Sequence, residues 1–176
     1  MIVRLTEGPL ETRYGLFREV LYYDGQRELI ALVKGDVAGA REVLCRVHSS
    51  CLRGHAFASV ECDCREQFET AQAMIERAGR GVLLWFDEEG RGNGHLALLA
   101  SIDLKRKGMK QAEAYEALGY ERDARSFGRA AEILNDLGVA SIVLLTGNPA
   151  KREGLEREKI TVAGTKKISL DRTPAS

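Results

Sequence analysis

The alternation of hydrophobic and polar residues predicts that the first third of the chain is mostly β-structure. The runs 16–23 and 28–33 are rich in aromatic and branched residues and read as strands. Asp24-Gly25 between them is a hairpin signal. A third strand is expected over 43–48.

Past residue 64 the hydrophobic period lengthens from two to about 3.6, which predicts an amphipathic helix. The apolar runs 82–86 and 142–145 have the length of buried strands, and each follows a helical stretch that ends in glycine. Further helices are expected over 95–107, closed by three basic residues and a glycine, and over 126–137. This order of elements predicts α/β units.

Composition is that of one soluble globular domain. The 176 residues carry 26 Lys plus Arg against 26 Asp plus Glu, so no overall field attracts nucleic acid. No apolar run approaches the length of a membrane span and no signal pattern precedes the first strand. We expect a cytoplasmic protein without nucleic-acid or membrane partners, with a domain over 1–165 and a mobile polar tail over 166–176.

Three cysteines, Cys51, Cys62 and Cys64, have the spacing C-x10-C-x-C. In an extended segment residues i and i+2 point the same way, so Cys62 and Cys64 can reach one metal ion while Asp63 faces elsewhere. Thiolates favour zinc, and three protein ligands with an open fourth position are typical of a catalytic site. The spacing therefore predicts a hydrolytic zinc centre.

Other interpretations of the cysteines remain open at this point. Cys45 alternates with Arg46 and His48 in the expected strand, so we expect it to face the core and not the metal. A closed structural zinc site completed by His48 or His55 is one alternative, and three ordinary buried thiols are another.

Several motifs in register resemble GTP cyclohydrolase II of riboflavin synthesis. In chain order they are Arg46-Val-His-Ser-Ser-Cys51, Cys62-Asp-Cys64 with Gln67, Glu89-Gly-Arg91, Asp123-Ala-Arg125, and Thr146-Gly-Asn-Pro149 with Lys151. Order and spacing match from about residue 30 to residue 163. The resemblance implies a single α/β domain with a mixed sheet and flanking helices, usually assembled as a homodimer.

The resemblance also implies a zinc- and magnesium-dependent enzyme that opens the guanine imidazole ring of GTP, releasing formate from C8 and pyrophosphate from the triphosphate. Cys51, Cys62 and Cys64 match the zinc ligands, and Mg²⁺ accompanies the triphosphate. Asp123 and Arg125 match the catalytic pair at the α-phosphate, assigned in the family as base and nucleophile. A guanidinium is almost always protonated, so an electrostatic clamp is the more ordinary role for the arginine. Taken alone, Asp123 would cap the helix expected near residue 126.

The substrate-binding residues carried over by the resemblance are Arg46, His48, Ser49, Gln67, Glu89, Gly90, Arg91, Gln111, Thr146 and Lys151. The carboxylate of Glu89 suits the N1 and N2 donors of guanine, which adenine lacks. Backbone N–H groups of the glycine-rich run 90–94 are expected to bind phosphate beside Arg91. Thr146 and Lys151 follow a strand, where ligands of open α/β sheets collect.

One departure from the family bears on the reaction. Ile102 stands where the family has a tyrosine near zinc and C8, and isoleucine cannot transfer a proton. With Leu96 and Leu99 it also fits an apolar helix stripe. Smaller departures are Ser50, Asp87, Glu88, Gln111 and Gly147.

The sequence therefore predicts ring opening of GTP with pyrophosphate release and the formyl group retained, giving a formylaminopyrimidinone ribosyl monophosphate. The alternatives are the complete reaction that releases formate and a catalytically inert guanine-nucleotide-binding regulator.

Overall fold

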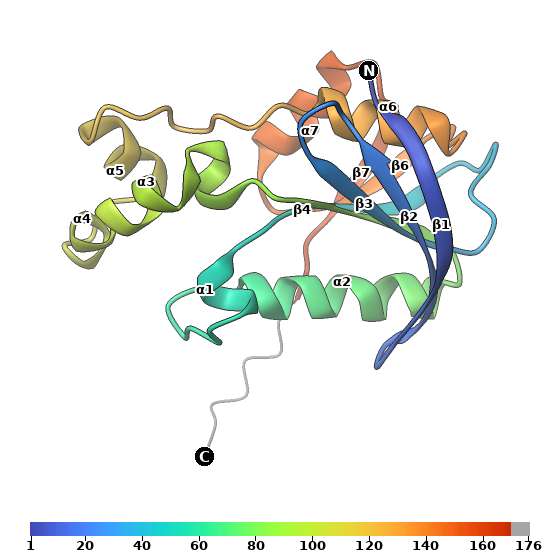
Figure 1. The fold of residues 1–176 in the computed structure, drawn as a ribbon, viewed down its shortest axis with the longest axis horizontal. Helices are drawn as coiled ribbons and strands as arrows, with labels where there is room; N and C mark the ends of the chain where they lie inside the picture. The colour runs from blue at the N-terminus through green and yellow to red at the C-terminus, as the bar shows by residue number, and fades with distance from the viewer. Residues whose placement is uncertain (170–176) are drawn as a thin grey trace.

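A computed structural model describes residues 1–169 as a seven-stranded mixed sheet flanked by helices (Figure 1). The sheet order is β1-β2-β3-β5-β4-β6-β7. Neighbours from β1 through β3 to β5 are antiparallel, whereas β5, β4, β6 and β7 are parallel to one another. The strands are β1 (Val3–Thr12), β2 (Gly15–Tyr23), β3 (Glu28–Lys34), β4 (Val43–Ser49), β5 (Gly81–Phe86), β6 (Ile142–Leu145) and β7 (Val162–Lys166). The expected α/β fold with a mixed sheet is confirmed.

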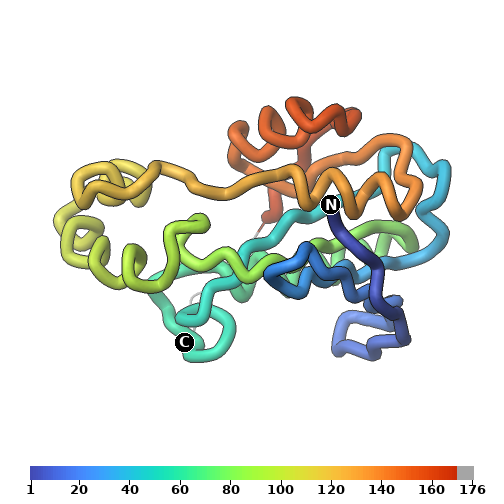
Figure 2. Tube along the Cα trace, turned by 45° about the horizontal axis from the view of Figure 1, so that its top comes forward, coloured from blue at the N-terminus to red at the C-terminus, as the bar shows by residue number. Residues whose placement is uncertain are grey.

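Helices cover both faces of the sheet. α2 (Cys64–Ala78) lies along one face, and α6 (Gly128–Asp136) and α7 (Pro149–Arg157) lie on the other (Figure 1). A separate arm stands beside the sheet and contains α3 (Gly94–Ala100), α4 (Ile102–Arg106) and α5 (Gln111–Ala117) (Figure 2). The one-turn elements α1 (Leu52–His55) and η1 (Glu89–Gly92) follow β4 and β5. No helix of residues 1–169 is long and apolar enough to cross a membrane.

The β2–β3 hairpin forms where the sequence predicts it. The Asp24 carboxylate accepts hydrogen bonds from the backbone N–H groups of Gln26 (2.8 Å) and Arg27 (2.7 Å), which close the turn. These bonds favour the ionised form and lower the pKa of Asp24.

Alternation along β4 separates the core from the site. Val43, Cys45 and Val47 are buried in the main hydrophobic core on the side of α6 and α7, while Arg46 and His48 face α2. Burial raises the pKa of Cys45 to about 12, so it remains a thiol. The prediction that Cys45 lies in the core is confirmed.

Several elements differ from the sequence prediction. The helix expected over 95–107 is broken at Ser101, which is buried and donates its hydroxyl to the Leu98 carbonyl. β1, β7, α5 and α7 were not predicted. Lys166, assigned to the tail, pairs with Leu145 in the sheet, and residues 170–176 of that tail lie outside the described residues.

Candidate functional site

Three strands that end side by side define the candidate site. β4 pairs in parallel with both β5 and β6, so their carboxyl ends meet at one edge of the sheet, where ligands of open α/β sheets bind. A cavity of about 490 Å³ opens at this edge, within the size range of small-molecule sites. Residues at or after the end of each of the three strands line it, including Ser49, Glu89 and Thr146.

The cavity gathers predicted residues from motifs far apart in the chain. Its walls include Arg46, His48, Ser49, Cys51, Cys62, Cys64, Gln67, Glu89, Gly90, Arg91, Gln111, Arg125, Thr146 and Lys151. Asp123 lies behind this wall, where its carboxylate accepts hydrogen bonds from Nε (2.7 Å) and Nη2 (2.5 Å) of Arg125. The helix α6 begins after Phe127, so Asp123 does not cap it and instead orients Arg125.

The three cysteines fit a metal ion. Their Sγ atoms all lie within 4.8 Å of one another, and those of Cys51 and Cys62 are 3.7 Å apart. A tetrahedral zinc with Zn–S bonds of about 2.3 Å separates its sulfurs by about 3.8 Å. A Cβ atom on Gly54 would lie 3.0 Å from the Cys62 sulfur, so glycine leaves the space that the cluster occupies.

The electrostatics of the cluster also favour a cation. A hydrogen bond between Cys51 and Cys64 lowers the pKa of Cys51 and raises that of Cys64. Three adjacent thiols cannot all ionise without a compensating charge, and a divalent cation supplies it. Within residues 1–169 no histidine or carboxylate joins the three sulfurs. The alternative of a fourth histidine ligand is therefore not supported by the geometry.

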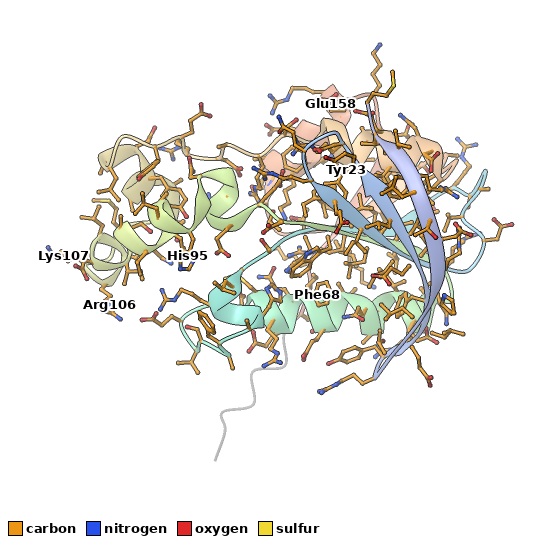
Figure 3. All side chains as sticks on the ribbon, viewed as in Figure 1. Tyr23, Phe68, His95, Arg106, Lys107 and Glu158 are labelled. Carbon is orange, nitrogen blue, oxygen red and sulfur yellow. The ribbon has the colours of Figure 1, made fainter. Side chains whose placement is uncertain are left out.

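The two histidines form an aromatic cluster instead. The ring of His48 stacks on Trp85 and meets the edge of Phe68, which points from α2 toward the sheet (Figure 3). Its Nε2 atom lies 3.1 Å from Nε2 of His55. Burial lowers the pKa of His48 to about 2, so this ring is neutral. His48 lines the cavity as a rigid, uncharged wall.

Positive charge is concentrated at the β6 side of the cavity. Arg46 and Lys151 are 6% and 7% exposed, and neither has a carboxylate within 4.0 Å among the described residues. Arg46 donates to Gln67 Oε1 (2.6 Å), and Lys151 Nζ donates to the Val47 carbonyl (2.9 Å). Desolvation, and then repulsion from Arg46 and Arg125, lower the pKa of Lys151. Desolvation, opposed most strongly by the nearby Cys64, brings the pKa of Arg46 to about 10. Buried cations without an ion-pair partner favour a bound polyanion.

The glycine-rich run forms a tight turn and not an open phosphate loop. Gly90, Arg91, Gly92 and Gly94 all have positive φ. The N–H groups of Gly92 and Asn93 donate within the turn to the carbonyls of Glu88 and Gly90, so these two groups, expected to bind phosphate, are already used. Ala124 N–H donates to the Arg91 carbonyl (3.0 Å), which ties the turn to the segment of the Asp123–Arg125 pair.

Two polar atoms beside this turn have no partner among the described residues. Glu89 Oε2 accepts from the Leu52 N–H (2.7 Å), whereas its Oε1 is buried and unpartnered. Tyr115 Oη is also buried and unpartnered. Tyr115 lines the cavity and was missed by the sequence analysis, because the helix α5 that carries it was not predicted.

Ile102 faces the sulfur cluster. It lines a smaller hollow with Cys51, Cys62 and Leu98, at the foot of the cavity. The apolar stripe expected for it is wrong, because Leu96 and Leu99 are 72% and 55% exposed. Gln111 holds the adjoining break in the helix by donating to the Ser101 hydroxyl (2.8 Å).

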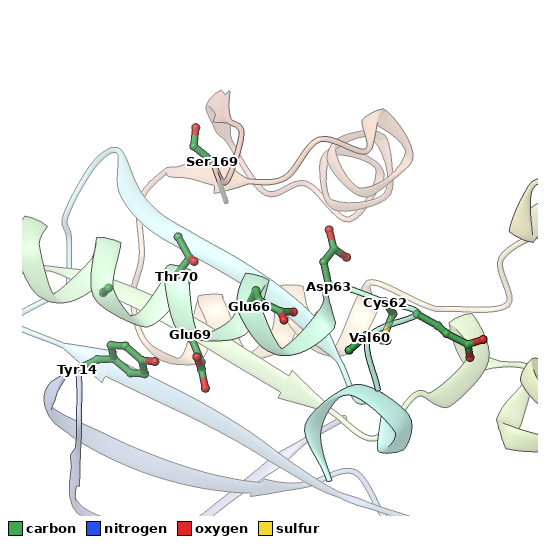
Figure 4. A pocket seen from close by; sticks show the side chains of 10 residues that line it. Tyr14, Val60, Cys62, Asp63, Glu66, Glu69, Thr70 and Ser169 are labelled. Atoms are coloured by element: carbon green, nitrogen blue, oxygen red, sulfur yellow. The ribbon is translucent and has the colours of Figure 1, made fainter. Parts of the chain in front are cut away.

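A second hollow lies along α2 and is acidic. Tyr14, Glu66, Glu69 and Thr70 line it, with Asp63 and Cys62 at one end (Figure 4). Its carboxylates repel a polyphosphate. A nucleotide therefore fits the cationic cavity at the strand ends and not this hollow.

Comparison with known proteins agrees with the motifs. The family model described as GTP cyclohydrolase II matches residues 3–167. GTP cyclohydrolase-2 of Streptomyces coelicolor is 46% identical over 165 residues, covering 92% of this chain and 74% of that protein. The riboflavin biosynthesis protein RibBA of Bacillus mycoides is 44% identical over 172 residues, covering 97% of this chain but 43% of its own length. RibBA of Salinispora tropica is 46% identical over 170 residues, covering 94% and 42% respectively. The chain thus spans less than half of the RibBA proteins, and it belongs to the GTP cyclohydrolase II family.

Proposed function

We propose that the protein binds zinc through Cys51, Cys62 and Cys64 and hydrolytically opens the imidazole ring of GTP, releasing pyrophosphate and retaining the formyl group. The observation that carries the proposal is one cavity that is lined both by a three-cysteine cluster and by two buried cations, Arg46 and Lys151, that have no carboxylate within 4.0 Å among the described residues. This arrangement suits a substrate with an electrophilic carbon and a polyphosphate. Family membership and the relative named GTP cyclohydrolase-2 support GTP as that substrate.

The proposed reaction balances with two waters. One water cleaves the bond between the α- and β-phosphates, and pyrophosphate leaves. The second adds at C8 and the C8–N9 bond breaks, so that C8 remains as a formyl group on N7 and the ribose-bearing N9 takes a proton and becomes a secondary amine. A third water would be needed to release formate.

Bound zinc would supply Lewis acidity and lower the pKa of a water near C8 toward neutrality. The protein's own residues do the rest of the positioning. Arg46, Lys151 and Arg125 neutralise the phosphates, and Asp123 fixes the plane of the Arg125 guanidinium through its two hydrogen bonds. Because a guanidinium keeps its proton, we assign Arg125 as an electrostatic clamp. Glu89 Oε1, buried without a partner, is placed to accept from the guanine edge.

Retention of the formyl group is proposed from the side chain at position 102. Ile102 and Leu98 contribute apolar atoms to the hollow next to Cys51 and Cys62, whose other lining residues include Glu61 and Lys105. Neither Ile102 nor Leu98 can donate or accept a proton there. Loss of one general acid–base group typically slows a step by about 10²- to 10⁴-fold. The deformylation step would then be too slow to compete with product release.

The test is a product analysis. Zinc-loaded protein is incubated with GTP and Mg²⁺, pyrophosphate and formate are assayed, and the nucleotide product is weighed by mass spectrometry. We expect stoichiometric pyrophosphate, no formate, and a product heavier by one CO than the deformylated compound. Ile102→Tyr should gain formate release, while Leu99→Tyr, on the exposed side of the same arm, should not.

Two results would overturn the proposal. Stoichiometric formate from the unmodified protein would show the complete reaction. GTP binding without turnover would show an inert binding protein.

Two further parts of the proposal come from the family resemblance: Mg²⁺ bound with the triphosphate, and a homodimer. Pyrophosphate release with and without Mg²⁺ tests the first, and light scattering tests the second.

A further inference from the structure

Tyr115 is a buried phenol without a hydrogen-bond partner. Its side chain is 0% exposed, and no donor or acceptor among residues 1–169 lies within bonding distance of its Oη. An unpaired buried hydroxyl destabilises a protein, and native proteins satisfy nearly all such groups. The Tyr115 hydroxyl is therefore available to a group outside residues 1–169.

The unpartnered Tyr115 hydroxyl lies on the wall of the cavity, as does a second unpartnered atom. Tyr115 and Glu89 both line the cavity, and Glu89 Oε1 is likewise buried without a partner. The phenol rests against the strained turn, since a Cβ on Gly90 would be 3.3 Å from its Oη. Burial, together with the neighbouring Glu89 carboxylate, raises the pKa of Tyr115 to about 12. Tyr115 thus offers a donor next to an acceptor-only carboxylate.

We propose that Tyr115 donates its hydroxyl to the carbonyl O6 of the guanine ring whose N1–H and N2–H groups donate to Glu89. This inference rests on the proposed function, because it needs a guanine nucleotide in this cavity. Guanine presents O6, N1–H and N2–H in a row, so a neutral phenol beside a carboxylate matches that edge. Adenine presents an amino donor at position 6 and no donor at N1 or C2, so it offers no acceptor at position 6 for the phenol proton and no N1–H or N2–H for Glu89.

Tyr115 and Ile102 line different spaces. Ile102 lines the small hollow with Cys51, Cys62 and Leu98, whereas Tyr115 lines the main cavity, whose walls include Glu89 as well as the three cysteines. The Tyr115 hydroxyl rests against Gly90, the residue after Glu89, so we assign the phenol to recognition of the base as a specificity-determining residue.

The test compares GTP with a nucleotide that lacks O6. The fluorescent triphosphate of 2-aminopurine riboside has no O6 and therefore no N1–H, but it keeps the 2-amino donor for Glu89. Its binding to zinc-loaded protein is followed directly, with GTP measured by competition in the first seconds after mixing. In Tyr115→Phe we expect GTP affinity to fall about 5- to 15-fold and 2-aminopurine nucleotide affinity to stay within about twofold. The melting temperature of the free variant should be unchanged or higher, since an unpaired hydroxyl is removed. Tyr120→Phe, which removes a phenol after the end of α5, is the matched control and should change neither affinity.

The remaining outcomes distinguish failure of the inference from failure of the proposed function. Equal weakening of both nucleotides, or no change in either, would give Tyr115 a packing role. A lower kcat with unchanged GTP affinity would give it a role in proton transfer. Selective loss of GTP affinity together with formate release would uphold Tyr115 and refute only the arrested reaction. Failure of the wild-type protein to bind GTP would refute both proposals.

Discussion

Replacing Lys151 by methionine separates the energetic cost of a buried cation from its contribution to binding. Lys151 is 7% exposed, its Nζ donates to the Val47 carbonyl, and Arg46 and Arg125 repel it. Methionine keeps an unbranched apolar stem and removes the charge. The substitution should therefore change the pH dependence of stability and weaken the binding of a triphosphate.

The sign of the pH effect follows from the pKa of Lys151, which the fold lowers. Between the folded and unfolded pKa values the unfolded chain binds more protons, so the free energy of unfolding of the wild type rises with pH. This contribution has a slope of up to about 1.4 kcal/mol per pH unit and ends near the unfolded pKa of about 10.4. Lys151→Met lacks it, so its stability relative to the wild type is greatest at low pH and declines as pH rises. The Val47 carbonyl loses its donor at every pH, which changes the stability difference between the variant and the wild type by the same amount at each pH.

The binding effect follows from the lost charged hydrogen bond. Such a bond contributes roughly 1.5 to 3 kcal/mol, so GTP affinity should fall roughly 10- to 150-fold. Urea denaturation between pH 7 and pH 9.5 measures the first effect, and equilibrium binding of GTP at pH 7.5 measures the second. Lys107→Met, at an exposed position of the arm, is the control that removes a lysine charge outside the cavity. A stability difference independent of pH, or unchanged GTP affinity, would refute the reasoning.

Other substitutions test the metal cluster and the base. Cys62→Ser should remove most of the bound zinc while Cys45→Ala retains it, as measured by metal analysis; zinc loss in the second variant alone would reverse the ligand assignment. Gly54→Ala should lower zinc affinity, because its Cβ would lie 3.0 Å from the Cys62 sulfur, and a chelator competition that shows wild-type affinity would contradict this. Glu89→Gln should reduce the preference for GTP over ATP roughly 10- to 150-fold, whereas equal selectivity in calorimetry would remove Glu89 from base recognition.

The sequence alone determined those features that depend on local periodicity. The two-residue period of β4 sends Cys45 to the core and Arg46 and His48 to the opposite face, because side chains alternate in any strand. The Asp24-Gly25 dipeptide predicted the β2–β3 hairpin, because a turn signal also depends only on residues close together in the chain. Asn148-Pro149, which begins α7, carried a similar local start signal that was not used.

The sequence pattern did not predict the elements whose burial depends on contacts with distant parts of the chain. β1 is an edge strand with mostly exposed or half-exposed side chains, so its residues show no core-facing alternation. Leu96 and Leu99 have the spacing of a buried stripe, yet the break at Ser101 and the outward position of the arm leave them exposed. The packing of α3 and α4 places Leu98 and Ile102, and not Leu96 and Leu99, on the wall of the hollow that contains Cys51 and Cys62.

The same distinction between local and long-range information applies to the site. Motif spacing named the residues that could bind zinc and phosphate, since those chemistries belong to particular side chains. Tertiary structure alone brought the three strand ends together, left Arg46 and Lys151 without a carboxylate within 4.0 Å among the described residues, and set Tyr115 and Glu89 on the wall of one cavity. Burial and the absence of partners are properties of an assembled cavity, and they arise from contacts between residues that are remote in the chain.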